Sequence, residues 1–390
     1  MALIATMIAL TGCAAPARVG PGDVVASMPV ASAASVTPLS MPESTTPDLA
    51  HQVLSNLTVD QKIGQLLMVA LTRGNSPSGL ADLVSHGETT GVLLLGNGWG
   101  NDAVSQAVNA LLQQNADQPV GLYITADQEG GKVQRLSGDG FDRIPAATVQ
   151  GTWTTDDLTT AATKWAQQLS AAGVNLNLAP VTDTVPNSMR ASNKPIGALQ
   201  REFGSDPDLV GAQAAAFIQG MTAGGVQTCP KHFPGLGRVT GNTDFSTVGI
   251  VDSTTSRDDA LLTAFTAGMA AHPAMVMVSL ATYSLIDPDN PAAFSQIIVT
   301  QMLRGDLGWD GVVISDSMDA AAVKAIPVAQ RGVDFIKAGG DIAIFPGVND
   351  LKTAAAGIKQ QIDASPDFAA LVDAAVLRVL QAKNAAGLLG

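Results

Sequence analysis

Residues 312–318, VVISDSM, are the clearest signal of the fold because they join an apolar strand to a polar end. Val312, Val313 and Ile314 are β-branched, and Asp316 follows them after one serine. A strand that is apolar on both faces is typical of a buried parallel sheet. Seven other short apolar runs have the same character: Ile63–Leu71, Gly91–Leu95, Val120–Asp127, Val174–Val181, Val226–Phe233, Ala274–Thr282 and Asp341–Pro346.

Helical segments lie between these runs, and several begin at Asp or Ser and end at Gly, as capped helices do. The clearest are Asp156–Ala172, Asp206–Ala223, Ser256–Ala271 and Ala293–Leu307. Eight strands that alternate with helices predict a single (β/α)8 TIM barrel, an α/β fold. A doubly wound open sheet is the alternative, but the glycine-rich turn at residues 96–100 lacks the G-x-G-x-x-G spacing of that fold.

The composition excludes several classes of protein. The chain has 390 residues, of which 46% are hydrophobic, so it can bury a large core. It carries 21 Lys and Arg against 34 Asp and Glu, and this net charge of −13 disfavours nucleic acid as a partner. Two cysteines, Cys13 and Cys229, and four scattered histidines exclude a disulfide framework and a Cys-rich or His-rich metal site. We therefore expect no metal and no cofactor.

The first 47 residues predict an export signal and a tether. Residues 1–12 are apolar and uncharged but too few to span a bilayer, which needs about 20 residues, so they predict a signal peptide. Residues 10–13, LTGC, resemble the bacterial lipobox, in which the cysteine, here Cys13, is acylated. The alternative is a chance cysteine after the signal. Residues 13–47 predict a flexible tether, and residues 48–390 predict the folded domain. We expect a secreted monomer that a lipid holds on the outer face of the membrane.

Charged residues follow several of the predicted strands. Asp127 and Glu129 follow the third strand, Lys231 and His232 lie at the end of the fifth, and Asp316 ends the seventh. In a barrel these ends meet at one rim, where active sites lie. Carboxylates without a metal-ligand cluster indicate acid–base or nucleophilic chemistry, and paired carboxylates are typical of glycosidases.

Four motifs resemble those of glycoside hydrolase family 3, in the family's order: DQEGG at 127–131, R-x-FG at 201–204, KHFPG-x-G at 231–237 and SDSM at 315–318. The chain most resembles the single-domain bacterial β-N-acetylglucosaminidases. The resemblance implies a (β/α)8 barrel, no metal, and retaining hydrolysis of a terminal β-linked sugar. It also implies that Asp316 is the nucleophile. The sugar-binding residues that it implies are Asp127, Arg135, Arg201, Lys231 and His232.

One motif departs from the family's pattern. The acetylglucosaminidases carry D-S-H after the fifth strand, whereas this chain has Asn242-Thr243-Asp244, so Asp244 occupies the position of the acid–base histidine. A carboxylic acid can replace the imidazole if the site raises its pKa, which makes Asp244 the candidate acid–base residue and Glu129 the next one. N-acetylglucosamine is the expected sugar. The alternatives are a β-glucoside or an envelope arabinan-type polysaccharide, and a lipoprotein that binds glycans without hydrolysing them.

Each candidate also has a purely structural interpretation. Asp316 could cap the next helix, and Asp244 could only form an Asx turn. Asp127 and Arg201 could belong to ion pairs with nearby residues, Asp206 and Asp208 in the case of Arg201. His232 could be a buried core histidine. Asp183, at the end of the fourth strand, is expected to be structural or a minor contact at the rim.

Overall fold

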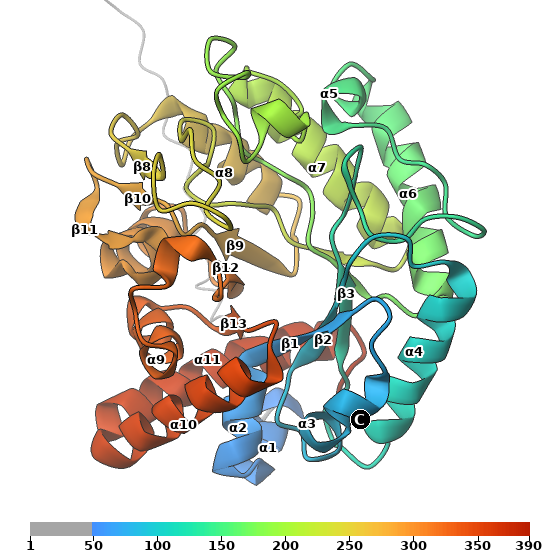
Figure 1. Cartoon of the computed structure of the whole chain (residues 1–390), viewed down its shortest axis with the longest axis vertical. Helices are drawn as coiled ribbons and strands as arrows, with labels where there is room; N and C mark the ends of the chain where they lie inside the picture. Colours follow the sequence, from blue (N-terminus) through green and yellow to red (C-terminus); the bar gives the residue numbers. More distant parts are fainter. Residues whose placement is uncertain (1–48) are drawn as a thin grey trace, which may run out of the picture. The chain divides into compact units, whose positions relative to one another are not determined.

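The computed structural model describes residues 49–390 (Figure 1). The predicted signal peptide, Cys13 and the tether lie outside the described residues. Eight parallel strands form one sheet in the order β7-β6-β3-β2-β1-β13-β12-β9. The strands are β1 (Leu67–Thr72), β2 (Gly91–Leu95), β3 (Tyr123–Ala126), β6 (Leu176–Asn177), β7 (Gln227–Thr228), β9 (Met275–Val278), β12 (Val312–Ser317) and β13 (Ile342–Ile344).

The two outer strands of that order also meet, so the sheet closes. Phe233, beyond the end of β7, forms a parallel bridge with Val278 of β9. The Phe233 amide donates to the Met277 carbonyl at 2.8 Å, and the Ser279 amide donates to the Phe233 carbonyl at 2.9 Å. The prediction of a (β/α)8 barrel is confirmed, and Figure 1 shows the helices around the outside of the strands.

The outer helices follow the strands in turn. They are α3 (Ala81–Ser85), α4 (Asn101–Gln114), α6 (Thr155–Ala171), α7 (Pro207–Ala223), α8 (Thr263–Met269), the π-helical segment η5 (Ile297–Asp306), α9 (Val328–Ala338), α10 (Val348–Ala364) and α11 (Pro366–Ala385). The caps explain where the helices begin: Asp206 accepts a hydrogen bond from the Asp208 amide at 3.1 Å, and Pro207 occupies the first position of α7. No described helix is long and apolar enough to cross a membrane.

Two predicted boundaries are wrong. Ile63–Leu66 is not part of the first strand, because residues Val59–Gln65 form the helix α2, which a capping box of Thr58 and Gln61 initiates. The segment Ser256–Ala271 is not one helix. The side chain of Asp259 caps a short 3₁₀ turn there, and α8 begins only after it.

Irregular segments at the carboxyl ends of the strands build the rim. A two-stranded ribbon, β4 (Gln128–Gly130) with β5 (Val133–Gln134), follows β3. A three-stranded sheet of β8 (Val251–Asp252), β10 (Thr282–Tyr283) and β11 (Asp287–Pro291) extends the rim beyond β7 and β9. These segments hold the loops that carry the predicted site residues.

Candidate active site

One pocket of about 600 Å³ lies where the predicted site residues converge. All seven of those that fall in the described chain line it: Asp127, Arg135, Arg201, Lys231, His232, Asp244 and Asp316. Asp316 lies at the end of β12, and the other six lie in the segments that follow β3, β6 and β7. A cluster of three or more His, Cys, Asp or Glu side chains suited to a metal does not occur within residues 49–390.

The DQEGG motif forms a rigid turn that aims two carboxylates. The amide of Gln128 donates to the side chain of Asn177 at 2.9 Å, and that side chain donates back to the Gln128 carbonyl at 3.1 Å. Gly130 follows with φ +104°, where a Cβ would lie 2.3 Å from the Pro145 carbonyl oxygen, so only glycine fits. Asp127 and Glu129 are thereby fixed on either side of Gln128.

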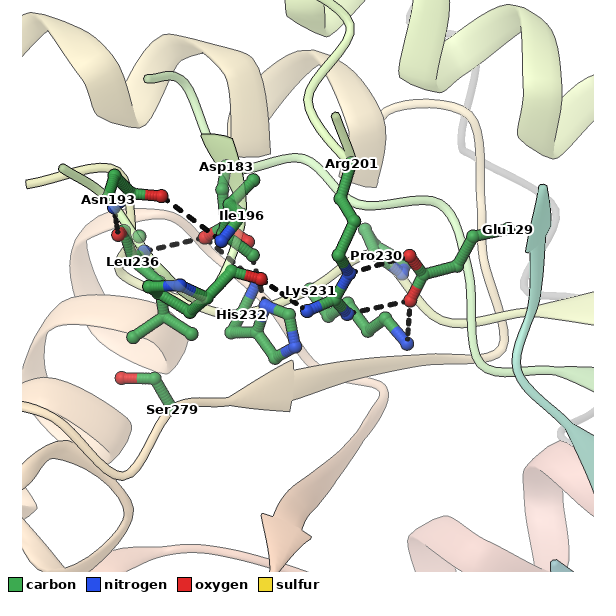
Figure 2. A network of polar contacts seen from close by, with 12 residues as sticks. Glu129, Asp183, Asn193, Ile196, Arg201, Pro230, Lys231, His232, Leu236 and Ser279 are labelled. Atoms are coloured by element: carbon green, nitrogen blue, oxygen red, sulfur yellow. Dashed lines mark hydrogen bonds and ion pairs between the residues drawn. The ribbon is translucent and has the colours of Figure 1, made fainter. Parts of the chain in front are cut away.

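A buried ion network joins three of the motifs (Figure 2). The Lys231 ammonium lies 2.7 Å from both Asp127 Oδ1 and Glu129 Oε1. The Arg201 guanidinium binds Glu129 with two hydrogen bonds, of 2.8 and 2.7 Å. Lys231 and Glu129 side chains are only 2% and 4% exposed. Because these side chains are buried, the positive charges of Lys231 and Arg201 must be balanced by the negative charge of Glu129.

These contacts decide the protonation state of Glu129. Burial alone raises the pKa of its carboxyl group, but the charges of Arg201 and Lys231 outweigh burial and hold the pKa well below its usual range. Such a group stays ionised near neutral pH and has no proton to donate. The structure therefore argues against Glu129 as the second candidate acid. Arg201 pairs with Glu129 rather than with Asp206 or Asp208.

Asp127 faces the same pocket from the other side of Gln128. Its Oδ2 lies 3.3 Å from Arg135 Nη2, and Arg135 also donates to Asn97 Oδ1 at 2.9 Å. Burial raises the pKa of Asp127, but the Lys231 and Arg135 charges lower it further, so the net shift is downward. An ionised carboxylate beside two cations is suited to bind the hydroxyl groups of a sugar.

Asp183 has the structural role that the sequence predicts, and it acts on a predicted site residue. Its Oδ2 lies 2.7 Å from His232 Nδ1, and its Oδ1 accepts the His232 amide at 3.2 Å and the Leu236 amide at 2.6 Å (Figure 2). Asp183 is fully buried. It therefore fixes the orientation of the imidazole, whose Nε2 has no hydrogen-bond partner within the described chain.

Asn193 is a residue that sequence analysis missed. Its side-chain amide donates to the carbonyls of Leu236 and Val239 at 2.6 and 2.7 Å, and its oxygen accepts the amides of Ile196 and Gly197 (Figure 2). It ties the loop after β6 to the start of the loop that carries Asp244. No pattern around Asn193 indicates this role, because its partners are all backbone groups.

Asp316 does not cap a helix. The next helical segments, η6 (Ala321–Val323) and α9, begin after Ala320 and Pro327. Its Oδ1 accepts the Ser317 amide at 2.8 Å, whereas Oδ2 makes no hydrogen bond to any of residues 49–390. The carboxyl group is thus held at the end of β12 with one oxygen available to the pocket.

The Asp244 loop is docked beside that strand. The Asp244 amide donates to Asn242 Oδ1 at 2.9 Å, so the Asx turn belongs to Asn242 and does not use the Asp244 carboxyl group. The carbonyls of Thr243 and Asp244 accept the amides of Ala322 and Ala321, both at 3.1 Å. These bonds attach the loop to η6, next to Asp316.

The pocket changes the acidity of Asp244. Its side chain is exposed at the mouth, but the surrounding protein displaces enough water to raise its pKa, and the negative charge of Asp316 raises it further, to about 6. The positive charges of His232 and Arg201 oppose this shift without cancelling it. A carboxylic acid with a pKa near 6 can both give and take a proton near neutral pH.

Comparisons with known proteins place this arrangement in a family. Residues 58–382 match the model of the glycosyl hydrolase family 3 N terminal domain. The chain is 33% identical over 287 residues to a β-hexosaminidase of Xylella fastidiosa (strain M23), which covers 71% of this chain and 82% of that protein. A β-hexosaminidase of Vibrio cholerae serotype O1 is 35% identical over 281 residues, 68% of this chain and 77% of its own length.

A solved structure agrees with these sequence relatives. The crystal structure of a β-N-acetylhexosaminidase from Beutenbergia cavernae DSM 12333 superimposes with a TM-score of 0.81 and is 45% identical. The match covers 84% of this chain and 99% of that one. The protein described here belongs to glycoside hydrolase family 3.

Proposed function

We propose that the protein is a retaining, exo-acting β-N-acetylhexosaminidase that releases terminal β-linked N-acetylglucosamine from cell-wall-type glycans. The observation that carries this proposal is a pair of carboxyl groups in one pocket, Asp316 and Asp244, of which the second has a raised pKa. Retaining glycosidases need this combination of a nucleophile and a proton donor. The names of the relatives in Xylella, Vibrio and Beutenbergia support the choice of sugar.

In the first step the Asp316 carboxylate attacks the anomeric carbon, and Asp244 protonates the glycosidic oxygen of the leaving group. The negative charge of Asp316 disappears when the ester forms. Because that charge helps to raise the pKa of Asp244, the pKa falls in the intermediate. Asp244 is then a carboxylate, and it removes a proton from the water that hydrolyses the ester.

The buried ion network supplies the sugar-binding groups. Asp127, Arg135, Arg201, Lys231 and His232 present charged or polar atoms to the pocket from fixed positions. Each sugar hydroxyl left without a partner on burial costs about 1–3 kcal/mol, so such a set of fixed groups favours one terminal sugar. The ion pairs hold these side chains in place before the sugar arrives.

One specific observation supports a different terminal sugar as the alternative substrate. The loop after β7 carries Asn242, Thr243 and Asp244 where the acetylglucosaminidases have D-S-H, so no imidazole acts from this loop. A β-glucoside or an arabinan-type polysaccharide is therefore the alternative substrate class. A binding protein without activity is disfavoured, because glycan binding alone does not require Asp316 at the anomeric carbon or a proton donor at position 244.

The place of the enzyme in the cell is part of the proposal. A lipid on Cys13 would hold a monomeric enzyme on the outer face of the cell membrane, close to envelope glycans. The LTGC sequence at residues 10–13 and the low-charge stretch that follows support this placement.

A panel of 4-nitrophenyl glycosides tests the function. The wild-type protein is expected to release 4-nitrophenol from the β-N-acetylglucosaminide faster than from the β-glucoside or an arabinofuranoside. Asp316→Asn should abolish turnover of the preferred glycoside and leave the fold intact by circular dichroism. Normal activity in Asp316→Asn would refute the mechanism, whereas a different preferred glycoside would replace only the sugar.

A further inference from the structure

The residue after the candidate acid is an unusually exposed aromatic side chain. Phe245 is 83% exposed and yet lines the catalytic pocket. A phenyl ring on the surface of a soluble protein leaves a large apolar area in water, and such residues often mark binding sites. The backbone around it is fixed: the Phe245 amide donates to the Asn242 carbonyl at 3.1 Å.

The position of Phe245 identifies the side of the substrate that it can reach. Asp244 must face the glycosidic oxygen, which joins the terminal sugar to the leaving group. In the proposed mechanism the terminal sugar binds among Asp127, Lys231 and Asp316, which are all less exposed than Asp244. An exposed residue next to Asp244 in the chain therefore borders the space that the leaving group occupies.

Polar groups border the same mouth. Asp319 and Lys324 both line the pocket. They follow Asp316 in the chain, on either side of η6. Ser317 Oγ donates to Asp319 Oδ1 at 2.7 Å, and Lys324 forms no ion pair with any of residues 49–390. An apolar ring with charged groups nearby suits a pyranose, which has an apolar face and an edge of hydroxyl groups.

We propose that Phe245 is the platform on which a sugar ring of the leaving group stacks, with Asp319 and Lys324 available to its hydroxyl groups. This inference rests on the proposed hydrolase function and specifies its leaving-group site. It makes the enzyme selective for glycans over small alkyl glycosides, because an alkyl leaving group has no ring to stack on Phe245.

Two substrates whose leaving groups both need protonation test the proposal. N,N′-diacetylchitobiose has a sugar as leaving group, whereas methyl β-N-acetylglucosaminide has none, and both need protonation by the acid. Phe245→Ala should lower kcat/KM for the disaccharide by about 3- to 10-fold, the usual worth of an aromatic contact, and leave the methyl glycoside unchanged. Phe245→Trp should restore the preference. Hydrolysis of 4-nitrophenyl β-N-acetylglucosaminide by the wild-type protein reports separately on the proposed function.

Val248 provides a matched control. It is 77% exposed in the same loop but does not line the pocket, so Val248→Ala should leave the ratio of the two substrates unchanged. An equal loss on both substrates in Phe245→Ala would mean that Phe245 only positions Asp244, and this would overturn the proposal. An unchanged disaccharide rate in Phe245→Ala would overturn it as well.

Discussion

Removing the Asp244 carboxyl group should slow the hydrolysis of substrates whose leaving group needs a proton and spare those whose leaving group does not. General acid–base catalysis contributes about 10²- to 10⁴-fold, so Asp244→Ala should lose that factor on N,N′-diacetylchitobiose. The 2,4-dinitrophenolate group leaves without protonation. The first step on a 2,4-dinitrophenyl glycoside should therefore be nearly unaffected in Asp244→Ala. The variant should fold normally, because the contacts that dock the loop use the backbone of residue 244.

The pH dependence follows from the raised pKa of Asp244. A general acid works only while protonated, so kcat/KM for the disaccharide should fall as the pH rises through about 6. At pH 7 only about a tenth of the molecules carry the proton. Asp244→Ala should remove this limb of the profile, and Asp244→Asn, which has the same shape but does not titrate, should remove it too.

Added azide completes the assay. It attacks the glycosyl-enzyme without a general base, so it should accelerate Asp244→Ala on the dinitrophenyl glycoside and yield a β-glycosyl azide. The wild type has its general base, so azide should change its rate little. An equal loss on both substrates, no effect of azide, and an unchanged pH limb would together refute Asp244 as the acid–base group.

Three further outcomes are expected. Glu129→Gln leaves two buried cations poorly paired and should lower the free energy of unfolding by about 3–5 kcal/mol. Because the folded pKa of Glu129 is depressed, the wild type should begin to lose this difference as the pH falls below about 4.5 and lose the rest as the pH falls through the folded pKa, so thermal unfolding at pH 7 and pH 4 checks the sign of the change. Asp183→Asn should release the orientation of His232 and raise KM more than it lowers kcat, as steady-state kinetics on a pure, folded variant would show; an unchanged KM would contradict it. Cys13→Ala should move the protein from the membrane fraction to the soluble fraction, and a variant that stays in the membrane fraction would disprove the lipid anchor.

The strands and the pocket were predictable because their signals are local. A run of apolar residues on both faces indicates a buried parallel strand, and a charged residue at its end indicates the rim. The beginning of β1 could not be predicted. The apolar run Ile63–Leu71 shows no hydrophobic periodicity that distinguishes a helix from a strand. The capping box of Thr58 and Gln61 is the signal that distinguishes them.

The partners within the site could not be predicted, because they are distant in sequence. Arg201 binds Glu129, 72 positions away, whereas the acidic residue Asp206 nearby is used to cap α7. Asp183 and His232 are 49 positions apart, and the parallel pairing of the neighbouring strands β6 and β7 brings them together. Sequence patterns named the residue types but not the pairs.

Trapping the covalent intermediate tests the mechanism at its chemical centre. A 5-fluoro-N-acetylglucosaminyl fluoride should react with the enzyme, and the fluorine on the sugar should slow hydrolysis of the ester enough for peptide mass spectrometry. The mechanism predicts one sugar on the peptide that contains Asp316. A sugar on another carboxylate, such as Asp127, or steady fluoride release without any adduct, would contradict it.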